Sequence, residues 1–193
     1  MLALLVLTGL ALPTHPAPAQ DPLACRTMNT ERLPLATRQS PLDSLSFVVG
    51  TARVKLCYGR PSVRGRTIFG GALVPFGKLW RTGANEPTMI HTTGPIAIAG
   101  VRVPAGSYSI YTIPGSAEWD VIVNRSITQW GHESQYTEAV RNQEVGRGSA
   151  RSEALSDPVE TLTFRVEPSP DQAAVLLLEW ERTRVRIPLA PGS

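Results

Sequence analysis

A run of basic side chains without an acidic neighbour is the first feature of this sequence that could do chemistry. Between Ser44 and Asn85 there are seven basic residues and no Asp or Glu. The seven are Arg53, Lys55, Arg60, Arg64, Arg66, Lys78 and Arg81. Arginines that share a loop can bind carboxylate or phosphate oxygens through paired N–H groups, and several can converge on one anion. The segment therefore predicts a binding site for a small anionic molecule, and ion pairs with the acidic C-terminal strands are the alternative.

Two motifs hold most of the candidate site residues. RPSVRGR, at residues 60–66, predicts a loop because Pro61 and Gly65 disfavour regular structure. WRTGANE, at residues 80–86, combines an aromatic ring, a cation, an amide and a carboxylate. The ligand-binding residues that we expect, including one at a later strand end, are Arg60, Arg64, Arg66, Trp80, Arg81, Asn85, Glu86 and Asn124.

WRTGANE has two interpretations. In the first, Trp80 offers a stacking face, and Glu86 and Arg81 are candidate catalytic residues of a hydrolase or lyase. Glu86 would act as the acid or base, and Arg81 would stabilise an oxyanion. In the second, Arg81 and Glu86 pair with each other or with Arg60, and Trp80 fills the core. Asn124 likewise offers either a polar contact to a ligand or a cap for a turn.

The sequence lacks the motifs of several well-known enzyme classes. It contains no GxSxG elbow, P-loop, dinucleotide fingerprint or HExxH zinc motif. Beyond the N-terminal leader, the two imidazoles are those of His91 and His132. A metal site would need both of them to converge with Glu86 or Glu133. We therefore expect no metal and no cofactor.

Composition and charge exclude several classes of protein. Of the 193 residues, 42% are hydrophobic and 18% are charged, which excludes an intrinsically disordered chain. The 17 Pro and 16 Gly indicate many turns rather than a bundle of long helices. The net charge of +3 is well below that of a typical nucleic-acid-binding domain, so we expect no nucleic-acid partner. The oligomeric state stays open.

The N-terminus has the pattern of a secretory signal peptide. The apolar run of residues 1–12 is too short to cross a bilayer as a helix, and residues 17–19 (APA) form a small-x-small cleavage site. We therefore expect a signal peptide over residues 1–19 and a periplasmic or secreted protein with no transmembrane segment. A flexible tether over residues 20–41 would precede one domain over residues 42–190.

The chain has two cysteines, Cys25 and Cys57. In an oxidising compartment they can form a disulfide, and closing a loop of this length stabilises a fold by roughly 3–4 kcal/mol. Lipidation of Cys25 is the alternative, although Asp21 interrupts the apolar run that a lipidation signal needs.

Short apolar or alternating runs recur along the domain and predict strands. They cover residues 45–49, 53–58, 88–92, 96–98, 107–113, 119–123, 160–166, 174–180 and 184–189. Short turns, such as residues 99–101 and 181–183, separate them, so neighbouring strands should pair in antiparallel hairpins. Alternation places Tyr108 and Tyr111 on opposite faces of their strand. We predict an all-β fold, an antiparallel β-sandwich of jelly-roll-like or meander topology, with one short surface helix at residues 133–144.

Four stretches carry a resemblance to a known family. They are the run from RPSVRGR to WRTGANE, which includes IFGGALVPFGK, followed by PAGSYSIYTIPG, WDVIVN and QWG. The chain resembles a bacterial family of secreted proteins catalogued as a domain of unknown function, from about residue 41 to residue 189. The resemblance implies an exported, mostly β domain and transfers no catalytic residue. Residues 134–155 depart from the family's pattern.

Three functions are consistent with these features. The first is binding of an anionic or carbohydrate-like small molecule, which requires the arginines of both motifs to surround one hollow. The second is the hydrolase or lyase, which requires a partly buried Glu86 beside open volume. The third is an envelope structural or assembly protein, which requires a flat basic face that meets an acidic partner or an anionic glycolipid.

Overall fold

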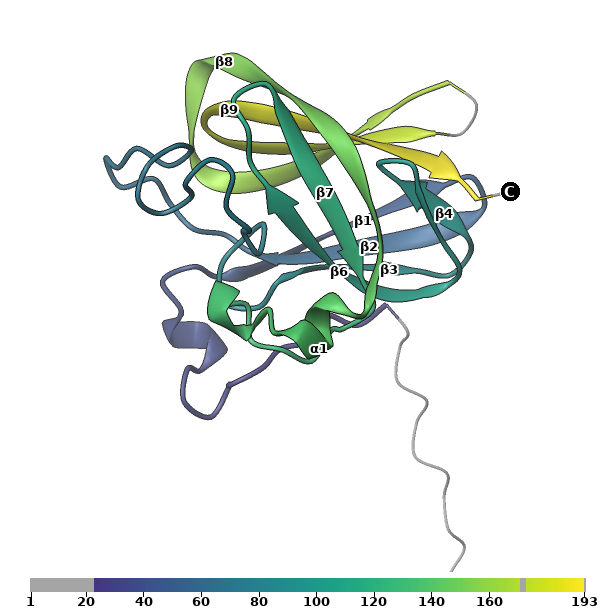
Figure 1. Ribbon diagram of the computed structural model, residues 1–193, viewed down its shortest axis with the longest axis horizontal. Helices are drawn as coiled ribbons and strands as arrows, with labels where there is room; N and C mark the ends of the chain where they lie inside the picture. The colour runs from purple at the N-terminus through teal and green to yellow at the C-terminus, as the bar shows by residue number, and fades with distance from the viewer. Residues whose placement is uncertain (1–22, 171–172, 193) are drawn as a thin grey trace, which may run out of the picture.

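Figure 1 shows the computed structural model, which describes residues 23–170 and 173–192. The strands are β1 (Leu42–Val49), β2 (Ala52–Gly59), β3 (Thr88–Thr92), β4 (Ile96–Ile98), β5 (Val101–Val103), β6 (Gly106–Ile113), β7 (Glu118–Asn124), β8 (Glu144–Pro168) and β9 (Ala174–Pro191). The helical elements are the 3-10 turns η1 (Leu35–Thr37) and η2 (Glu133–Gln135) and the helix α1 (Glu138–Arg141). In this part of the chain, no helix is long and apolar enough to cross a membrane. The predicted signal peptide, residues 1–19, lies outside the described residues.

The strands form one nine-stranded sheet with the order β1-β2-β3-β6-β7-β8-β9-β4-β5. The prediction that short turns join paired strands is wrong for β5 and β6, which follow each other in the chain but do not pair. Every neighbouring pair in the sheet is antiparallel, as predicted. The β4–β5 hairpin shows why: Ala99 and Gly100 both have positive φ angles, 48° and 83°, which suits a two-residue hairpin turn. The prediction of a mostly β, antiparallel fold with one short helix is confirmed. The sheet is not closed, and its division into a sandwich or jelly roll stays a prediction.

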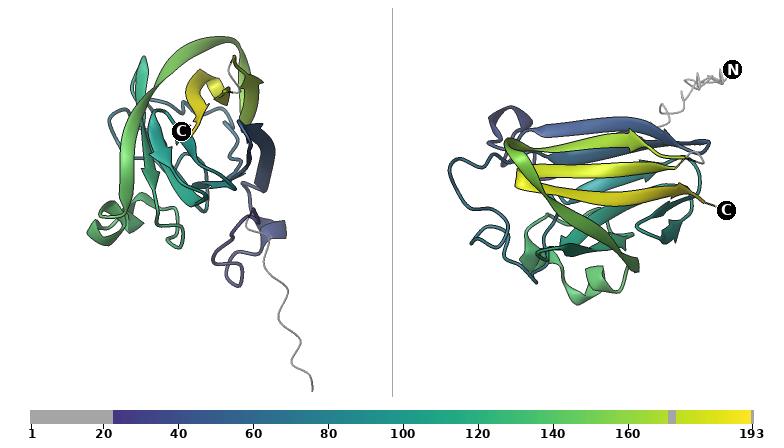
Figure 2. Two further views of the ribbon diagram at one scale, coloured as in Figure 1. Left: turned by 90° about the vertical axis from the view of Figure 1, so that its right-hand side faces the viewer. Right: turned by 90° about the horizontal axis from the view of Figure 1, so that it is seen from above.

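The two C-terminal strands are longer than the sequence pattern indicates, at 25 residues for β8 and 18 for β9. The first part of β8 pairs with β7, and the later part pairs with β9. Where it passes from one partner to the other, β8 arches over the molecule (Figure 2). The predicted turn at residues 181–183 is wrong, because β9 runs through it; the register shifts on either side of Glu181 come from extra residues on β8. The predicted helix at residues 133–144 is also too long: α1 has four residues, and Glu144 already belongs to β8.

The apolar side chains form one main core inside the curved sheet. Four of its rings contact one another at centroid distances of 4.9 to 6.1 Å, and they belong to Phe69, Trp80, Trp119 and Trp180. Tyr108 lies in this core, whereas Tyr111 packs in a second cluster on the opposite face of β6. The alternation predicted for this strand is therefore confirmed, and it fixes which face of β6 points inward.

The N-terminal strap, which we define as residues 23–41, lies against the sheet in place of the expected flexible tether. A disulfide joins Cys25 to Cys57 on β2. Farther along the strap, Arg38 Nη1 donates a hydrogen bond to Glu86 Oε2 at 2.7 Å. The side chains of this ion pair are 0% and 5% exposed, so the strap is held by a buried contact as well as by a covalent one. Residues 20–22 of the predicted tether lie outside the described residues.

Candidate functional site

The loop between β2 and β3 carries both motifs and surrounds a cavity of about 300 Å³ at one end of the sheet. We call it the arginine cavity. Its wall includes Arg64 and Arg66 from RPSVRGR and Trp80 and Arg81 from WRTGANE. These four predicted site residues therefore lie around one hollow, as the ligand-binding hypothesis requires.

Residues distant in the sequence complete the wall of the arginine cavity. Gln39 and Ser40 come from the strap, His132 and Glu133 from the segment before α1, and Trp180 from β9. The sequence analysis did not assign these residues to the site, because each reaches the cavity through a different long-range contact. The one signal that pointed near them was QWG, which directly precedes His132.

Arg81 is only partly neutralised by the residues around it. Its Nη1 donates hydrogen bonds to the Glu133 carboxylate at 3.1 and 3.2 Å and to the Gly131 carbonyl at 3.3 Å. Its Nε–H is buried and has no hydrogen-bond partner among the described residues. The same holds for the indole N–H of Trp180, which is fully buried. A buried donor without an acceptor is costly, but both of these N–H groups are closed to solvent, so neither faces the open volume of the cavity.

The guanidinium groups of Arg64 and Arg66 donate hydrogen bonds to neutral groups and not to carboxylates. Arg64 Nη1 donates to the Gln39 side-chain oxygen at 3.0 Å, and Arg66 donates to the Ser62 and Val63 carbonyls at 2.7 and 2.9 Å. Within the described residues, neither guanidinium forms an ion pair with a carboxylate. Their positive charge is therefore available to an incoming anion.

Several carboxylates of the C-terminal strands pair with cations of the same strands, whereas Glu160 and Glu181 accept backbone N–H groups of the loop between β2 and β3. Glu179 pairs with Arg165 and Arg184, and Glu167 pairs with Arg186. Arg60 is the predicted site residue that does have a structural role, because it pairs with Asp43 at 3.1 Å and donates to β8. It does not line the arginine cavity.

Asn85 and Asn124 also stay away from the cavity. Asn85 donates from Nδ2 to the Ser40 carbonyl at 2.8 Å, which fastens the end of the strap. Asn124 is fully buried, donates to the Val140 carbonyl at 2.7 Å and accepts the Ser126 N–H at 2.7 Å. Its contacts are those of a residue that caps a turn, the alternative to a ligand contact.

Glu86 is not arranged as an acid or base. It is 4% exposed and does not line the arginine cavity. Its Oε1 accepts the Met28 N–H at 2.6 Å, and its Oε2 accepts from Arg38 at 2.7 Å. Both oxygens are therefore engaged by the strap, and the hydrolase or lyase hypothesis loses the residue on which it depends.

Trp80 contributes a wall rather than a stacking platform. It is 5% exposed, and its ring lies over that of Trp180, with centroids 6.0 Å apart and planes at 18°. A sugar ring needs an open aromatic face to stack on, and Trp80 does not offer one. The alternative in which Trp80 fills the core describes its position.

His132 has a defined orientation beside Glu133. Its Nδ1 accepts the Ser134 N–H at 3.2 Å, so the neutral ring carries its proton on Nε2. No cluster of three metal-ligating side chains occurs in residues 23–170 and 173–192. The chemistry of the arginine cavity is therefore that of hydrogen-bond donors, with guanidinium groups outnumbering carboxylates.

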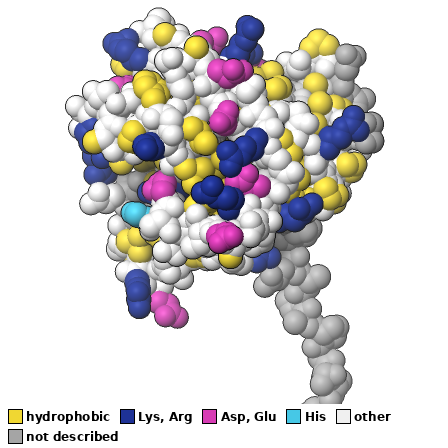
Figure 3. Space-filling model, in the orientation of Figure 1, with side chains coloured by type: hydrophobic (Ala, Val, Ile, Leu, Met, Phe, Trp, Pro, Cys, Tyr) yellow, Lys and Arg dark blue, Asp and Glu magenta, His cyan; other side chains and the backbone are white. Residues whose placement is uncertain are grey.

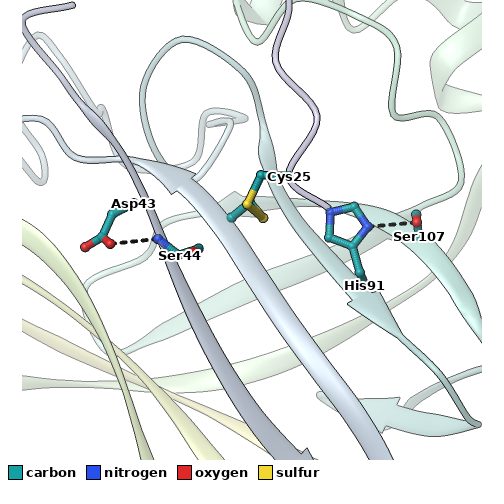
Figure 4. The surroundings of a disulfide bond; sticks show 6 residues. Cys25, Asp43, Ser44, His91 and Ser107 are labelled. Carbon is teal, nitrogen blue, oxygen red and sulfur yellow. Dashed lines mark hydrogen bonds between the residues drawn. A yellow bond between two sulfur atoms is a disulfide. The ribbon is translucent and has the colours of Figure 1, made fainter. Parts of the chain in front are cut away.

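A larger cavity, of about 1020 Å³, lies between the strap and the ends of β3 and β6. Arg26 is the one charged side chain in its described lining. Figure 4 shows that the disulfide lies close to His91, whose Nδ1 is 2.8 Å from the Ser107 hydroxyl. With one cation, this cavity offers much less to an anion than the arginine cavity does.

The charged side chains of the surface are mixed in sign. On the face shown in Figure 3, Lys and Arg side chains are interspersed with Asp and Glu. This face is not the flat basic surface that the envelope assembly hypothesis requires.

Comparison with known proteins agrees with the resemblance seen in the motifs. A family model described as a protein of unknown function (DUF2911) matches residues 40–189. No curated protein and no solved structure matches the chain. The functional argument therefore rests on the geometry described above.

Proposed function

Because the chain belongs to the DUF2911 family, whose description names no activity, we propose from the geometry that it binds a small anionic molecule in the arginine cavity. One observation carries the proposal. Arg64 and Arg66 line the cavity without a carboxylate partner among the described residues, and Arg81 shares the wall with one carboxylate, that of Glu133.

The charge of the cavity favours a carboxylate or a phosphate. Three guanidinium groups line it, and Glu133 is the one carboxylate among the lining residues. Hydrogen bonds between a guanidinium and an anion are shorter and stronger than those between neutral groups, at about 1.5–3 kcal/mol each. An anion would therefore offset the excess positive charge of the wall.

The size of the cavity favours a small ligand. A volume of about 300 Å³ is at the lower end of the range for ligand pockets, which suits a dicarboxylate, a uronate or a phosphorylated sugar. We assign recognition to the acid group rather than to a sugar ring, because Trp80 has no open face. A carbohydrate-like ligand is then one possible carrier of that acid group.

We propose that this binding takes place in the periplasm or outside the cell. Two features support an oxidising compartment: the signal-peptide pattern of residues 1–19 and the Cys25–Cys57 disulfide. The ligand would then be a molecule that reaches the cell envelope.

A thermal-shift screen with phosphate, dicarboxylates, uronates and sugar phosphates tests the proposal. A ligand at about 100 times its Kd stabilises the protein by about 2.7 kcal/mol, which raises Tm by roughly 5–10 °C for a domain of this size. Arg81→Lys keeps the charge but removes the forked donor, and should reduce the shift for the same ligand.

Arg53→Ala is the matched control, because Arg53 is an exposed arginine of β2 that does not line the cavity. It should leave the shift unchanged. The proposal fails if no anion of these classes raises Tm. It also fails if a ligand shifts the Tm of Arg81→Lys as much as it shifts the Tm of the wild type and of Arg53→Ala.

A further inference from the structure

The loop that joins the two motifs carries exposed apolar side chains. Leu73 is 45% exposed and Phe76 is 47% exposed. Both lie in the loop between β2 and β3. We call residues 70–78 the apolar tip. Large apolar side chains in this position stay in contact with water unless another molecule covers them.

The apolar tip is anchored to the core. Val74, between the two exposed residues, is 1% exposed, and its carbonyl accepts the Gly70 N–H at 3.0 Å. The Gly77 N–H donates to the Pro114 carbonyl at 2.8 Å. Leu73 and Phe76 cannot turn inward together without withdrawing Val74 from the core, so their exposure is a fixed property of the fold.

Phe76 is held in its exposed position by Gly70. A Cβ atom at Gly70 would come within 2.6 Å of the Phe76 ring, so the ring lies directly against the backbone there. Gly70 also has a φ of 77°, a conformation that glycine adopts without strain. These local features present the ring to the outside rather than to the core.

Cations and carboxylates both contact the loop that carries the apolar tip: Glu160 Oε1 accepts the Arg64 N–H at 3.0 Å, and Glu181 Oε2 accepts the Ile68 N–H at 3.1 Å. Arg64, Arg66 and Lys78 are exposed on the same loop, and the segment that contains them has no acidic residue. Leu73 lines the arginine cavity together with Arg64 and Arg66, which places apolar and cationic side chains in one region. Gln39 of the strap accepts a hydrogen bond from Arg64 of this loop.

We propose that the apolar tip docks the protein on an anionic membrane surface. Leu73 and Phe76 insert at the boundary between headgroups and acyl chains, and Arg66 and Lys78 contact lipid phosphates. A bilayer accepts isolated apolar side chains, and binding strength comes from their burial together with attraction to anionic lipids. A stable protein partner would instead bury about 800 Å² on each side, and the large apolar side chains that the tip exposes are those of Leu73 and Phe76.

This inference goes beyond the proposed function and rests on a different observation, the exposure of Leu73 and Phe76. Docking of the tip would also bring the mouth of the arginine cavity close to the membrane surface. The two proposals can fail separately, because vesicle binding and binding of a soluble anion are measured independently.

Sedimentation with vesicles tests the docking. The purified protein should bind phosphatidylcholine vesicles that contain one third phosphatidylglycerol, and should bind pure phosphatidylcholine vesicles much more weakly. In Leu73→Ser/Phe76→Ser, partitioning to the anionic vesicles should fall about tenfold or more, since two apolar side chains no longer insert. Arg66→Ala/Lys78→Ala should reduce it as well, and salt should weaken the binding of the wild type.

Val48→Ser is the matched control. Val48 is 58% exposed and lies on β1 beside the β1–β2 turn, at the other end of the strand from the loop. It should bind vesicles as the wild type does. The proposal is overturned if the wild type does not bind anionic vesicles, or if Leu73→Ser/Phe76→Ser binds them equally well while its Tm shows that it is folded.

Phe76→Ser separates this inference from the proposed function, because Phe76 does not line the arginine cavity. This variant should lose vesicle binding and keep the Tm shift with a soluble anion. If the wild type binds vesicles but no soluble anion shifts its Tm, the proposed function fails and the docking stands. If the anion shift is present and vesicle binding is absent, the docking alone fails.

Discussion

Glu86 and Arg38 lie 48 positions apart in the chain and form an ion pair that is almost completely buried. Arg38 also donates from Nη2 to the Met28 carbonyl at 2.8 Å, so the guanidinium holds the strap and the carboxylate together. A buried charge is tolerated because its partner and its hydrogen bonds replace water. The carboxylate that looked catalytic in the sequence is therefore an anchor.

Arg38→Met should lower the free energy of unfolding by about 3–5 kcal/mol, because it leaves the Glu86 carboxylate buried without its partner. Urea denaturation at neutral pH measures the effect. Arg53→Met, a change at an exposed arginine, should stay within about 0.5 kcal/mol of the wild type. Removal of both charges in Arg38→Met/Glu86→Gln should recover part of the loss. Equal stability of Arg38→Met and the wild type would contradict the buried pair.

The segment between β7 and β8, residues 125–143, is the element that brings His132 and Glu133 to the arginine cavity. It covers the outer face of β6 and β7, where Tyr136 packs against Tyr111 with ring centroids 4.6 Å apart. The Tyr136 hydroxyl donates to Glu144 at 2.6 Å, at the start of β8. The position of one wall of the cavity therefore depends on contacts at the far side of the sheet.

Glu144→Gln should weaken this element in a pH-dependent way. Two hydrogen bonds from Arg147, both 2.9 Å long, are the main cause that lowers the pKa of the Glu144 carboxyl in the folded state. Such a group adds stability above its unfolded pKa of about 4.3, and that stability is lost as pH falls through the lower folded value. The free energy of unfolding of the wild type should therefore exceed that of the variant by about 1–2 kcal/mol at neutral pH.

Urea unfolding across the acid range checks the sign of this difference, which should shrink as pH falls. Glu118→Gln serves as the control, since Glu118 is an exposed carboxylate of β7 outside this contact. A difference that grows on acidification would contradict the assigned role of Glu144.

On the scale of the whole molecule, the curvature of the sheet brings distant strands together. β8 and β5 are separated in the sheet by β9 and β4, yet Gly148 of β8 lies against the turn between β4 and β5. A Cβ atom built at Gly148 would come within 1.8 Å of the Ala99 carbonyl oxygen. The backbones approach so closely there that only glycine fits without a shift.

Gly148→Ala should therefore destabilise the fold by at least about 2 kcal/mol, because the neighbour that the methyl group meets is backbone and cannot rotate away. Thermal unfolding should show a Tm lower by roughly 4–8 °C. Ser149→Ala, at the next and exposed position of β8, is the control and should change Tm little. A Tm of Gly148→Ala equal to that of the wild type would mean that the curled sheet does not persist in solution.

Local patterns predicted much of the sheet. Alternation placed Tyr108 and Tyr111 on opposite faces of β6, and turn chemistry predicted the β4–β5 hairpin. The first part of β8 was not predicted, since Gly146, Gly148 and the charged residues around them lack strand composition. Its side chains do not favour a strand, and backbone hydrogen bonds to β7 stabilise the strand instead.

The sequence by itself determined the family, the antiparallel β class and the concentration of arginines in one loop, because these are properties of neighbouring residues. Only the tertiary structure decided which charges neutralise one another. Glu86 is paired with Arg38, Arg81 reaches Glu133 across 52 positions, and Arg64 and Arg66 have no carboxylate partner among the described residues. Electrostatic and hydrogen-bond energies depend on distance in space and on burial, and the folded sheet sets both of these through contacts that no local spacing in the sequence encodes.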